Sequence, residues 1–405
     1  MSNAYIIGGG IVGLATAYKL SCKFENINIT VFEKENDVGM HQSTHNSGVL
    51  HCGLYYKPGS LKAKLAVDGI KQMTSFCQKY NIPHEICGKL VVATNDEESL
   101  RLNDLYDRGT KNGLQGLKFL SNQEEIYKIE PFVNKNVKNA LHVPQEGIVD
   151  YHKVINKLKQ LLLDKGHQII TDAKVVSIKN QTITISSNDS QEIDIQFSEK
   201  DTIINCAGLY SDKIAKLTTK IDSKIIPFRG EYYKLKPHAK KLVNNLIYPV
   251  PDPLFPFLGV HFTRLINGDI EAGPNAVLAF SREGYKLSDI NLYDILDYIT
   301  FKGLWKFIYK HKWMCISELR QSISKYHFCK SLQKLIPSIS INDIEYAGSG
   351  VRAQAMSSNG ELISDFEIIS DDNIYHVINA PSPAATSSLS IADYIVDKIK
   401  KYKTL

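Results

Sequence analysis

The sequence has few cysteines, and they form no recognisable pattern. Seven are scattered over 405 residues, without a CxxC pair, and no Cys/His cluster shows the spacing of metal ligands. Disulfide-stabilised secreted folds and zinc sites both depend on closer and more regular spacing. We therefore expect reduced thiols, no metal ion and a cytoplasmic location.

The chain also has little of what leads a protein into a membrane. Its apolar runs fall short of the roughly 18 residues needed to cross a bilayer. The opening MSNAYIIGGG carries no basic region ahead of an apolar stretch and no cleavage site, so it does not resemble a signal peptide. We expect neither a targeting segment nor a membrane span.

Neither sign of charge dominates. The net charge is +5 and 22% of the residues are charged, which does not indicate a nucleic-acid partner. The basic run KIKKYK at residues 398–403 is typical of a solvated helix face. With 43% hydrophobic residues the chain can bury a large core, and its length suits one two-lobed enzyme or two to three domains.

Alternating strand and helix patterns open the chain. Residues 4–7 predict a short strand, a glycine turn and an amphipathic helix follow, and residues 27–32 predict a second strand. Similar αβ segments return in the middle and at the end of the chain, and two other stretches interrupt them. We therefore predict two lobes built from discontinuous sequence. The first comprises residues 1–82, 146–221 and 341–405, and the second comprises 83–145 and 222–340.

Gly8, Gly10 and Gly13 form a GxGxxG motif between the first strand and the first helix. These glycines permit a tight turn, the approach of a pyrophosphate and close packing of the helix. Glu33, at the end of the second strand, can accept hydrogen bonds from ribose hydroxyls. Position alone does not choose between FAD and NAD. The second GxGxxA match, at 348–353, precedes a turn and predicts a glycine-rich loop. The chain therefore has one nucleotide-binding fold and a long remainder, for which a permanently bound FAD fits better than NAD.

Residues 44–56, THNSGVLHCGLYY, follow this unit and show neither strand alternation nor helical spacing. His45 and His51 are separated by small residues, which would let backbone N–H groups approach a ligand.

Specific motifs extend along the whole chain. They are GGGIVG, FEK at 32–34, HNSGVLHCGLYYKPGSLKAKL, INCAGLYSD, RGEYYKL, FLGVHFTR, GPNAVLAFSREGY, GVRAQA and NAPSPAATSSL. On these motifs the sequence resembles the FAD-dependent L-2-hydroxyglutarate dehydrogenase/oxidase family, within the D-amino-acid-oxidase-like flavoproteins. It departs from that family at Cys52, where a small residue is usual, and between the last two glycines of GSGVRAQ.

The resemblance implies an α/β and α+β fold with a GR2-type Rossmann-like FAD-binding domain and a sheet-based substrate domain. FAD would be bound non-covalently, and the N-terminus of the last helix would stabilise negative charge on the reduced flavin. The implied cofactor-binding residues are Gly8, Gly10, Ile11, Val12, Gly13, Glu33, Lys34, Thr44, His45, Asn46, Ser47, Gly48, Val175, Ala207, Gly208, Gly350, Val351, Ala384, Ala385 and Thr386.

The resemblance also implies oxidation of L-2-hydroxyglutarate to 2-oxoglutarate, with hydride transfer to flavin N5 and removal of the hydroxyl proton. Arg352 matches the position where related flavoproteins bind a carboxylate. His51 is the first choice for the base, because histidine titrates near neutral pH. His261 is the second, and it could equally bind the distal carboxylate. The implied substrate-binding residues are Arg352, Arg264, Tyr55 and Tyr248.

Two other functions remain open. An amine or amino-acid oxidase on the same fold would need the same arginine, and a nucleotide-binding scaffold would hold FAD only structurally. The electrons could pass to quinone or to oxygen. Residues 291–325 mix Trp, Tyr, Leu and Ile with Lys, and they predict a helical segment. It either packs on its own domain or rests on a membrane surface, which would be the inner face of the cytoplasmic membrane.

Overall fold

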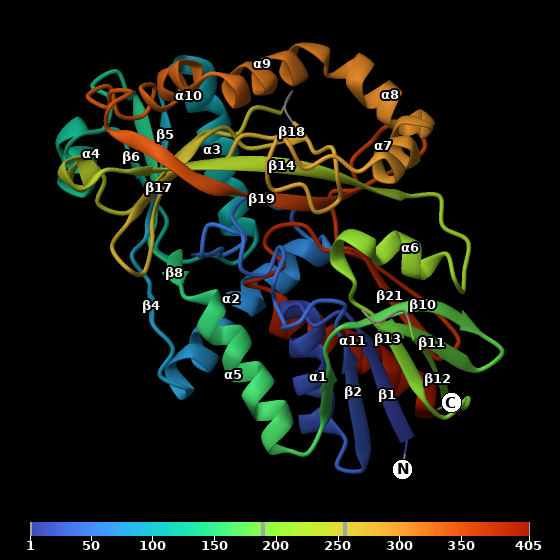
Figure 1. Ribbon diagram of the computed structural model, residues 1–405. Helices are drawn as coiled ribbons and strands as arrows, with labels where there is room; N and C mark the ends of the chain where they lie inside the picture. The colour runs from blue at the N-terminus through green and yellow to red at the C-terminus, as the bar shows by residue number, and fades with distance from the viewer. Residues whose placement is uncertain (1, 188–190, 254–256, 405) are drawn as a thin grey trace.

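Two large β-sheets, one in the lower and one in the upper half of Figure 1, organise the molecule. The structure, a computed structural model, describes residues 2–187, 191–253 and 257–404. Both ends of the chain lie beside the lower sheet (Figure 1).

The lower sheet has six strands in the order β20-β21-β13-β1-β2-β9. Neighbours are parallel except for β20 and β21. Its strands alternate between two buried faces, so Ala4 and Ile6 pack under the helices, while Tyr5 and Ile7 pack under β10 and β11. The strands are β1 (Ser2–Ile7), β2 (Ile27–Phe32), β9 (Gln168–Ile170), β13 (Thr202–Asn205), β20 (Glu367–Asp371) and β21 (Ile374–Asn379).

The glycine turn between β1 and α1 has a steric reason. Gly8 has a φ of +107°, and a Cβ there would lie 2.5 Å from the carbonyl oxygen of Cys206 at the end of β13. Gly13 faces the carbonyl of Gly8, where a Cβ would collide with the backbone. Glycine is therefore required at both positions for the turn to pass between two strands and enter the helix.

The upper sheet has nine strands in the order β18-β14-β17-β16-β15-β5-β7-β6, with β19 also paired to β14. All its pairs are antiparallel except β15 with β5. The strands are β5 (Lys89–Ala93), β6 (Lys118–Leu120), β7 (Asn139–Val143), β14 (Lys224–Leu235), β15 (Leu246–Pro249), β16 (His261–Arg264), β17 (Ile270–Gly273), β18 (Val277–Leu278) and β19 (Ile344–Met356).

Two small sheets complete the β-structure. One covers a face of the lower sheet, and the other lies where the chain passes between the two large sheets. The first contains β10 (Ala173–Lys179), β11 (Thr182–Ser187) and β12 (Glu192–Gln196), and the second contains β3 (Val49–Leu50), β4 (His84–Glu85) and β8 (Gly147–Val149).

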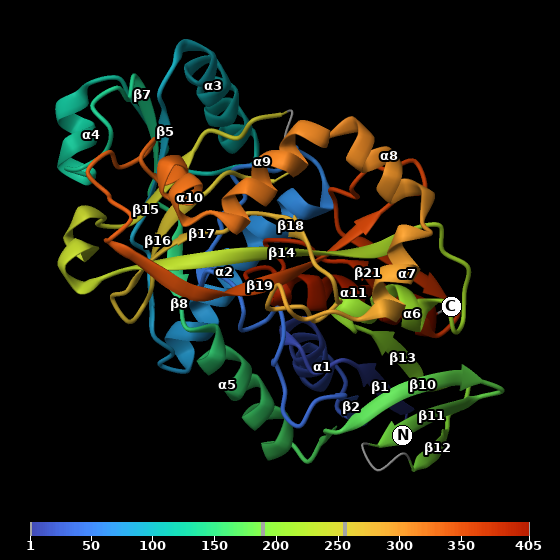
Figure 2. The ribbon, with the colours of Figure 1, turned by 45° about the horizontal axis from the view of Figure 1, so that its top comes forward.

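Helices cover the outer faces of both large sheets. Helices α1, α5 and α11 pack under the lower sheet, and Figure 2 shows α7 to α10 following one another outside β14 and β19. The helices are α1 (Ile11–Lys23), α2 (Leu61–Lys79), α3 (Asp96–Lys111), α4 (Gln123–Ile129), α5 (Tyr151–Asp164), α6 (Ser211–Ala215), α7 (Leu292–Ile299), α8 (Lys302–Lys310), α9 (Lys312–Ile323), α10 (Lys325–Leu332) and α11 (Ser388–Thr404), with 3-10 turns η1 (Gly208–Tyr210) and η2 (Pro237–Leu242). Within the described ranges, each helix is too short or too polar to cross a membrane.

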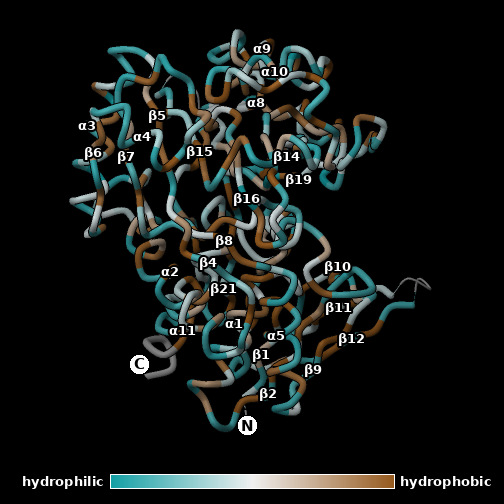
Figure 3. The backbone as a smooth tube through the Cα atoms, turned by 90° about the vertical axis from the view of Figure 1, so that its left-hand side faces the viewer, coloured by the Kyte–Doolittle hydropathy of each residue, from teal (hydrophilic) through white to brown (hydrophobic). Residues whose placement is uncertain are grey.

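The largest hydrophobic core joins the two halves. It begins with residues such as Leu14 on α1 and Ile391 on α11, and it continues through Leu50 to Leu246 and Tyr248 on β15. Figure 3 shows hydrophobic residues along this path between β15 and β1. Because one core spans both sheets, the segments that alternate along the sequence are held in a fixed relative position.

Two expected elements take a different form. Residues 291–325 form three short helices, α7 to α9, with Thr300 closing the first and His311 separating the other two. Residues 348–353 do not form a loop but belong to β19, which pairs with β14 along its whole length. Gly350 lies against the backbone of His45, where a Cβ would not fit, so this glycine serves a close approach within a strand.

Candidate active site

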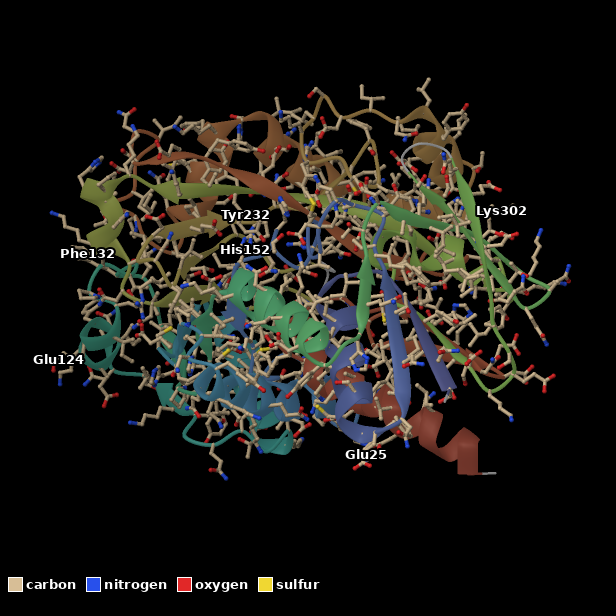
Figure 4. All side chains as sticks on the ribbon, turned by 60° about the horizontal axis from the view of Figure 1, so that its bottom comes forward. Glu25, Glu124, Phe132, His152, Tyr232 and Lys302 are labelled. Atoms are coloured by element: carbon tan, nitrogen blue, oxygen red, sulfur yellow. The ribbon has the colours of Figure 1, made fainter. Side chains whose placement is uncertain are left out.

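A cavity of about 790 Å³ lies between the two large sheets. Its size is typical of small-molecule and cofactor sites. The lining comes from segments far apart in sequence, including the β1–α1 turn, the 39–56 stretch, the ends of β10, β13 and β21, and β19. Figure 4 shows Tyr232, another lining residue, near the middle of the molecule, whereas Glu124 and Lys302 mark its outside.

Backbone and small side chains form the lower wall of the cavity. The N-terminus of α1 opens onto it through Gly10, Ile11 and Val12. A Cβ at Gly10 would lie 3.1 Å from Ser43 Oγ, and one at Gly208 would lie 2.9 Å from Gln42 Oε1. A larger residue at either position would therefore take up space between the backbone and the facing side chain at the cavity wall. An open helix N-terminus beside such a cradle fits the pyrophosphate of a dinucleotide.

The irregular stretch after β2 is held by its own hydrogen bonds. Asn46 Nδ2 donates to the carbonyls of Gln42 and Ser43 at 3.0 and 2.9 Å, and Asn46 Oδ1 accepts from Gly48 N at 2.9 Å. His45 Nδ1 lies 3.1 Å from the carbonyl of His41. These bonds bend the backbone along the cavity and engage the Asn46 amide within the loop itself.

Most of the predicted cofactor-binding residues line this cavity. Gly13, Thr44 and Gly48 do not, because Gly13 is buried in the first turn of α1 and the other two lie in the loop after β2. The predicted residues that the cavity brings together are Gly8, Gly10, Ile11, Val12, Glu33, Lys34, His45, Asn46, Ser47, Val175, Ala207, Gly208, Gly350, Val351, Ala384, Ala385 and Thr386.

Glu33 and Lys34 both line the cavity, and both also make hydrogen bonds or ion pairs with other residues of the protein. Glu33 Oε2 accepts a hydrogen bond from Gly9 N at 2.7 Å and so braces the glycine turn. Lys34 forms ion pairs with Glu35 and with Glu283, which belongs to the segment after β18. The ion pair to Glu283 links the end of β2 to the upper half of the molecule.

Arg352 supplies an unpaired positive charge to the upper wall. It lies on β19, its guanidinium is 5.4 Å from the centroid of the Phe257 ring, and it lines the cavity. Its Nη1 is buried and has no hydrogen-bond partner among the described residues. Burial lowers the pKa of Arg352, but an arginine remains charged at physiological pH. A buried cation of this kind fits a carboxylate on a ligand.

His51 is another residue of the cavity lining. Its backbone N donates to Thr386 Oγ1 at 3.2 Å, which ties it to the segment leading into α11. Its side chain is 16% exposed, and Nδ1 lies 3.3 Å from Glu146 Oε2. The ring is therefore held by a buried carboxylate on one side and faces the cavity on the other.

His261 also lines the cavity, in a different environment. Its ring stacks on Tyr248 with centroids 3.9 Å apart, and Nδ1 lies 3.0 Å from the carbonyl of Gly259. Burial lowers the pKa of His261 to about 3. His261 thus stays neutral at physiological pH and accepts a proton poorly, which favours His51 as the base.

Arg264 lies outside the cavity lining, so the expectation that it binds substrate is corrected. It forms an ion pair with Glu85 at 2.5 Å on the other side of the sheet. His261 and Arg264 are three residues apart on β16, and side chains an odd number apart on a strand point to opposite faces. Tyr55 and Tyr248, by contrast, do line the cavity.

Sequence reasoning missed two buried charges behind this wall. Lys89 begins β5 and lies fully buried between the rings of Tyr55 and Tyr248, at 4.3 and 4.9 Å from their centroids. Its Nζ lies 2.8 Å from Oε1 of Glu146, which is also fully buried. A lysine that opens an otherwise apolar strand, as in KLVVA, was the available signal.

Lys62 is a further cation on the lining. It lies in the first turn of α2, with Nζ 4.7 Å from the centroid of the Tyr56 ring and 3.2 Å from the carbonyl oxygen of Ser364. Burial lowers the pKa of Lys62 to about 8, and the charge of Asp365 opposes that change in part. Lys62 and Arg352 are therefore two of the cationic side chains on a lining that also includes Lys34, Arg108, Lys174 and Lys213.

Comparisons with known proteins agree with this site. The model of the DAO family, described as FAD dependent oxidoreductase, matches residues 3–398. The chain is 48% identical over 394 residues to an L-2-hydroxyglutarate dehydrogenase of Indibacter alkaliphilus, covering 97% of each chain. It is 43% identical to the mitochondrial L-2-hydroxyglutarate dehydrogenase of Homo sapiens, covering 98% of this chain and 88% of the relative.

Solved structures share the fold. An L-alpha-glycerophosphate oxidase from Mycoplasma pneumoniae, with FAD bound, has a TM-score of 0.77 at 23% identity and covers 99% of this chain and 95% of its own. A glycine oxidase from Geobacillus kaustophilus has a TM-score of 0.72 at 14% identity, with the same coverage. The expected fold class, an FAD-binding αβ domain with a sheet-based substrate domain, is thereby confirmed.

Proposed function

The chain belongs to the DAO family of FAD-dependent oxidoreductases, and from that membership we propose that it oxidises L-2-hydroxyglutarate to 2-oxoglutarate. Support comes from relatives named L-2-hydroxyglutarate dehydrogenase that are 40–48% identical over nearly the whole chain. The observation in the site that carries the proposal is Arg352 on the cavity lining, whose buried Nη1 has no hydrogen-bond partner among the described residues, together with His51 on the same lining.

FAD, when bound, accepts the hydride that leaves the substrate carbon. The residues that would hold it are those of the lower wall, at the α1 N-terminus, the 39–48 loop and the segment before α11. In this proposal residues 1–82, 146–221 and 341–405, apart from β19, serve as the FAD-binding domain. Residues 83–145 and 222–340, together with β19, serve as the substrate domain.

Arg352 binds and orients one carboxylate of the substrate. Its guanidinium is already desolvated, so an incoming carboxylate gains a strong charge-assisted interaction and is held in one orientation. Lys62 binds the distal carboxylate in place of Arg264. A second cation besides Arg352 suits a dicarboxylate, whereas a single cation would suffice for glycine or sarcosine.

His51 takes the proton of the substrate hydroxyl. Proton removal must accompany the loss of hydride from the same carbon, because the product is a ketone. Neutral His261, stacked on Tyr248, closes the opposite wall and excludes water from the reacting atoms. Removal of water strengthens the interactions of both charged groups.

Anaerobic mixing tests the reaction. The purified protein, with its flavin oxidised, should lose its visible flavin absorbance with L-2-hydroxyglutarate and keep it with D-2-hydroxyglutarate, glycine, glutamate or sarcosine. Bleaching by an amino acid instead would identify an amine or amino-acid oxidase. A yellow protein whose spectrum none of these compounds changes would identify a nucleotide-binding scaffold.

We also propose that α7 to α9 rest on an anionic membrane and that quinone is the electron acceptor. Trp305, Tyr309 and Trp313 on α8 and α9 are 58%, 80% and 74% exposed. Lys302, Lys306, Lys310 and Lys312 alternate with them, which is the combination found on interfacial helices. This face lies on the outer surface, away from the lower sheet (Figures 1 and 2).

Vesicle sedimentation and re-oxidation test this second proposal. The wild type should sediment with phosphatidylglycerol vesicles and much less with phosphatidylcholine vesicles. A Trp305→Ser/Tyr309→Ser/Trp313→Ser variant should remain in solution. Leu100→Ser, at a 68% exposed position on α3, is the matched control and should bind like the wild type. Equal binding by the triple variant, or re-oxidation by oxygen faster than by a soluble quinone, would contradict the proposal.

A further inference from the structure

Glu146 is a fully buried carboxylate that lies behind the cavity wall rather than on it. It precedes β8, in the turn that follows β7. It contacts Lys89, which is also fully buried, and His51, which lines the cavity. It is thus placed to act on the reaction only through His51.

The two oxygens of Glu146 have different partners. Oε1 lies 2.8 Å from Lys89 Nζ and accepts from the backbone N and the thiol of Cys52, each at 3.3 Å. Oε2 lies 3.3 Å from His51 Nδ1. Burial alone would raise the pKa of Glu146, but the charge of Lys89 and the hydrogen bond from His51 outweigh it and hold that pKa well below its usual range. The group is therefore a carboxylate, and it accepts hydrogen bonds without donating one.

We propose that Glu146 is the positioning residue for His51. Its Oε2 accepts the Nδ1–H of the imidazole, which leaves Nε2 unprotonated as the ring nitrogen available to the cavity. When the hydroxyl O–H bond breaks, its proton forms an N–H bond at Nε2, and the electron pair of the C–H bond leaves as hydride to FAD. The imidazolium then faces a carboxylate, as a catalytic histidine held by a buried acid does elsewhere. This inference rests on the proposed function.

Lys89 adds to the hydrogen bonds from His51 and from Cys52 N in keeping this carboxylate charged, so Lys89→Met still leaves the carboxylate with donors. An isolated carboxylate in such a position would be protonated rather than ionised, because burial strongly disfavours charge. The ammonium of Lys89 offsets the charge from the side away from His51, and the faces of the Tyr55 and Tyr248 rings enclose it. A purely structural explanation also exists, in which Glu146 serves only to neutralise Lys89.

Variants that lack the lysine separate these explanations. Lys89→Met leaves Glu146 paired with His51, and Glu146→Leu/Lys89→Met replaces the buried ion pair by apolar side chains of similar size. Both variants lack the charge of Lys89, so they differ only in the carboxylate. We expect flavin reduction by L-2-hydroxyglutarate to be about a hundredfold slower in the double variant than in Lys89→Met, the scale of losing general-base assistance. The dissociation constant of 2-oxoglutarate should change by less than about threefold between the two, since binding does not need the base.

The tautomer of His51 gives a readout that does not depend on turnover. In oxidised, substrate-free protein with ¹⁵N-labelled histidine, the His51 signals, assigned with His51→Asn, should show an Nδ1–H tautomer in the wild type and in Lys89→Met. The preference should disappear in Glu146→Leu/Lys89→Met. Glu146→Gln, which keeps a hydrogen-bond acceptor but loses the charge, should retain the tautomer in part and lie between the two in rate.

Equal reduction rates in the double variant and Lys89→Met, or an unchanged His51 tautomer, would overturn the inference. The ratio of FAD absorbance to protein absorbance checks that each variant folds and binds the cofactor. If the wild type is not reduced by L-2-hydroxyglutarate, the proposed function fails, and the tautomer comparison still judges the role of Glu146 separately.

Discussion

The two walls of the cavity are built in opposite ways. The lower wall consists of glycine turns, helix N-termini and small side chains, with the backbone itself as the main contact surface. The upper wall and the layer behind His51 contain buried charged side chains: Arg352, Lys89 and Glu146. The first design binds a cofactor through shape and peptide dipoles. In the upper wall, burying charged side chains is unfavourable in itself, but it provides groups that can bind a charged substrate.

Removal of the guanidinium on the upper wall should have the largest effect. Arg352→Met should lower kcat/KM for L-2-hydroxyglutarate by about 10³-fold, because the substrate carboxylate would lose the buried cation that binds and orients it. FAD content should be unchanged, since the lower wall is untouched. Steady-state kinetics and the flavin spectrum measure both quantities. Loss of FAD together with activity would show that FAD binding also depends on Arg352, so that the two walls do not act independently.

Replacement of the base should slow chemistry without weakening binding. His51→Asn should reduce the rate of flavin reduction by about a hundredfold in anaerobic stopped-flow experiments. His261→Asn should change it by less than about tenfold, because a histidine whose pKa has fallen to about 3 contributes little as a base. An unchanged rate in His51→Asn would assign the base role to His261.

Adding one methyl group at a glycine of the lower wall should lower both the stability of the protein and its retention of FAD. Gly8→Ala places a Cβ 2.5 Å from the Cys206 carbonyl oxygen at a φ of +107°. We expect a loss of about 2 kcal/mol in the free energy of unfolding and weaker FAD retention. Gly113→Ala is the matched control, because Gly113 also has a positive φ but open space around it, so it should cost about 1 kcal/mol and leave FAD bound. Equal losses in denaturant titrations would refute the steric argument.

The smallest expected effect is on the pH dependence of KM, through the binding of the distal carboxylate by Lys62. Lys62 loses its proton as the pH rises through about 8, so its positive charge is present below that pH and absent above it. KM for L-2-hydroxyglutarate should therefore rise severalfold between pH 7 and 9, by up to about tenfold. In Lys62→Met, KM should already be raised and should stay nearly constant over that range. A parallel rise in wild type and variant would exclude Lys62 as the cause.

Sequence patterns predicted the residues of the lower wall better than those of the upper wall. The GxGxxG motif, its strand and its helix lie within the first 33 residues, and contacts between near neighbours determine their conformation. The resemblance implied that Arg264 binds substrate beside His261, yet strand alternation places the two side chains on opposite faces. The 291–325 segment was recognised as helical, but its division into three helices depends on packing outside β14 and β19.

By itself the sequence determined the class of the protein: the dinucleotide turn, the motifs shared with one flavoprotein family, and Arg352 and His51 as chemically suitable residues. Only the tertiary structure decided which charges act together. Lys89 and Glu146 are separated by 57 positions, and Glu146 and His51 by 95, so nothing in their local sequence relates them. The stretch THNSGVLHCGLYY contains the histidine, but the carboxylate that orients it comes from a distant turn, because buried charges are stable only where folding supplies a partner.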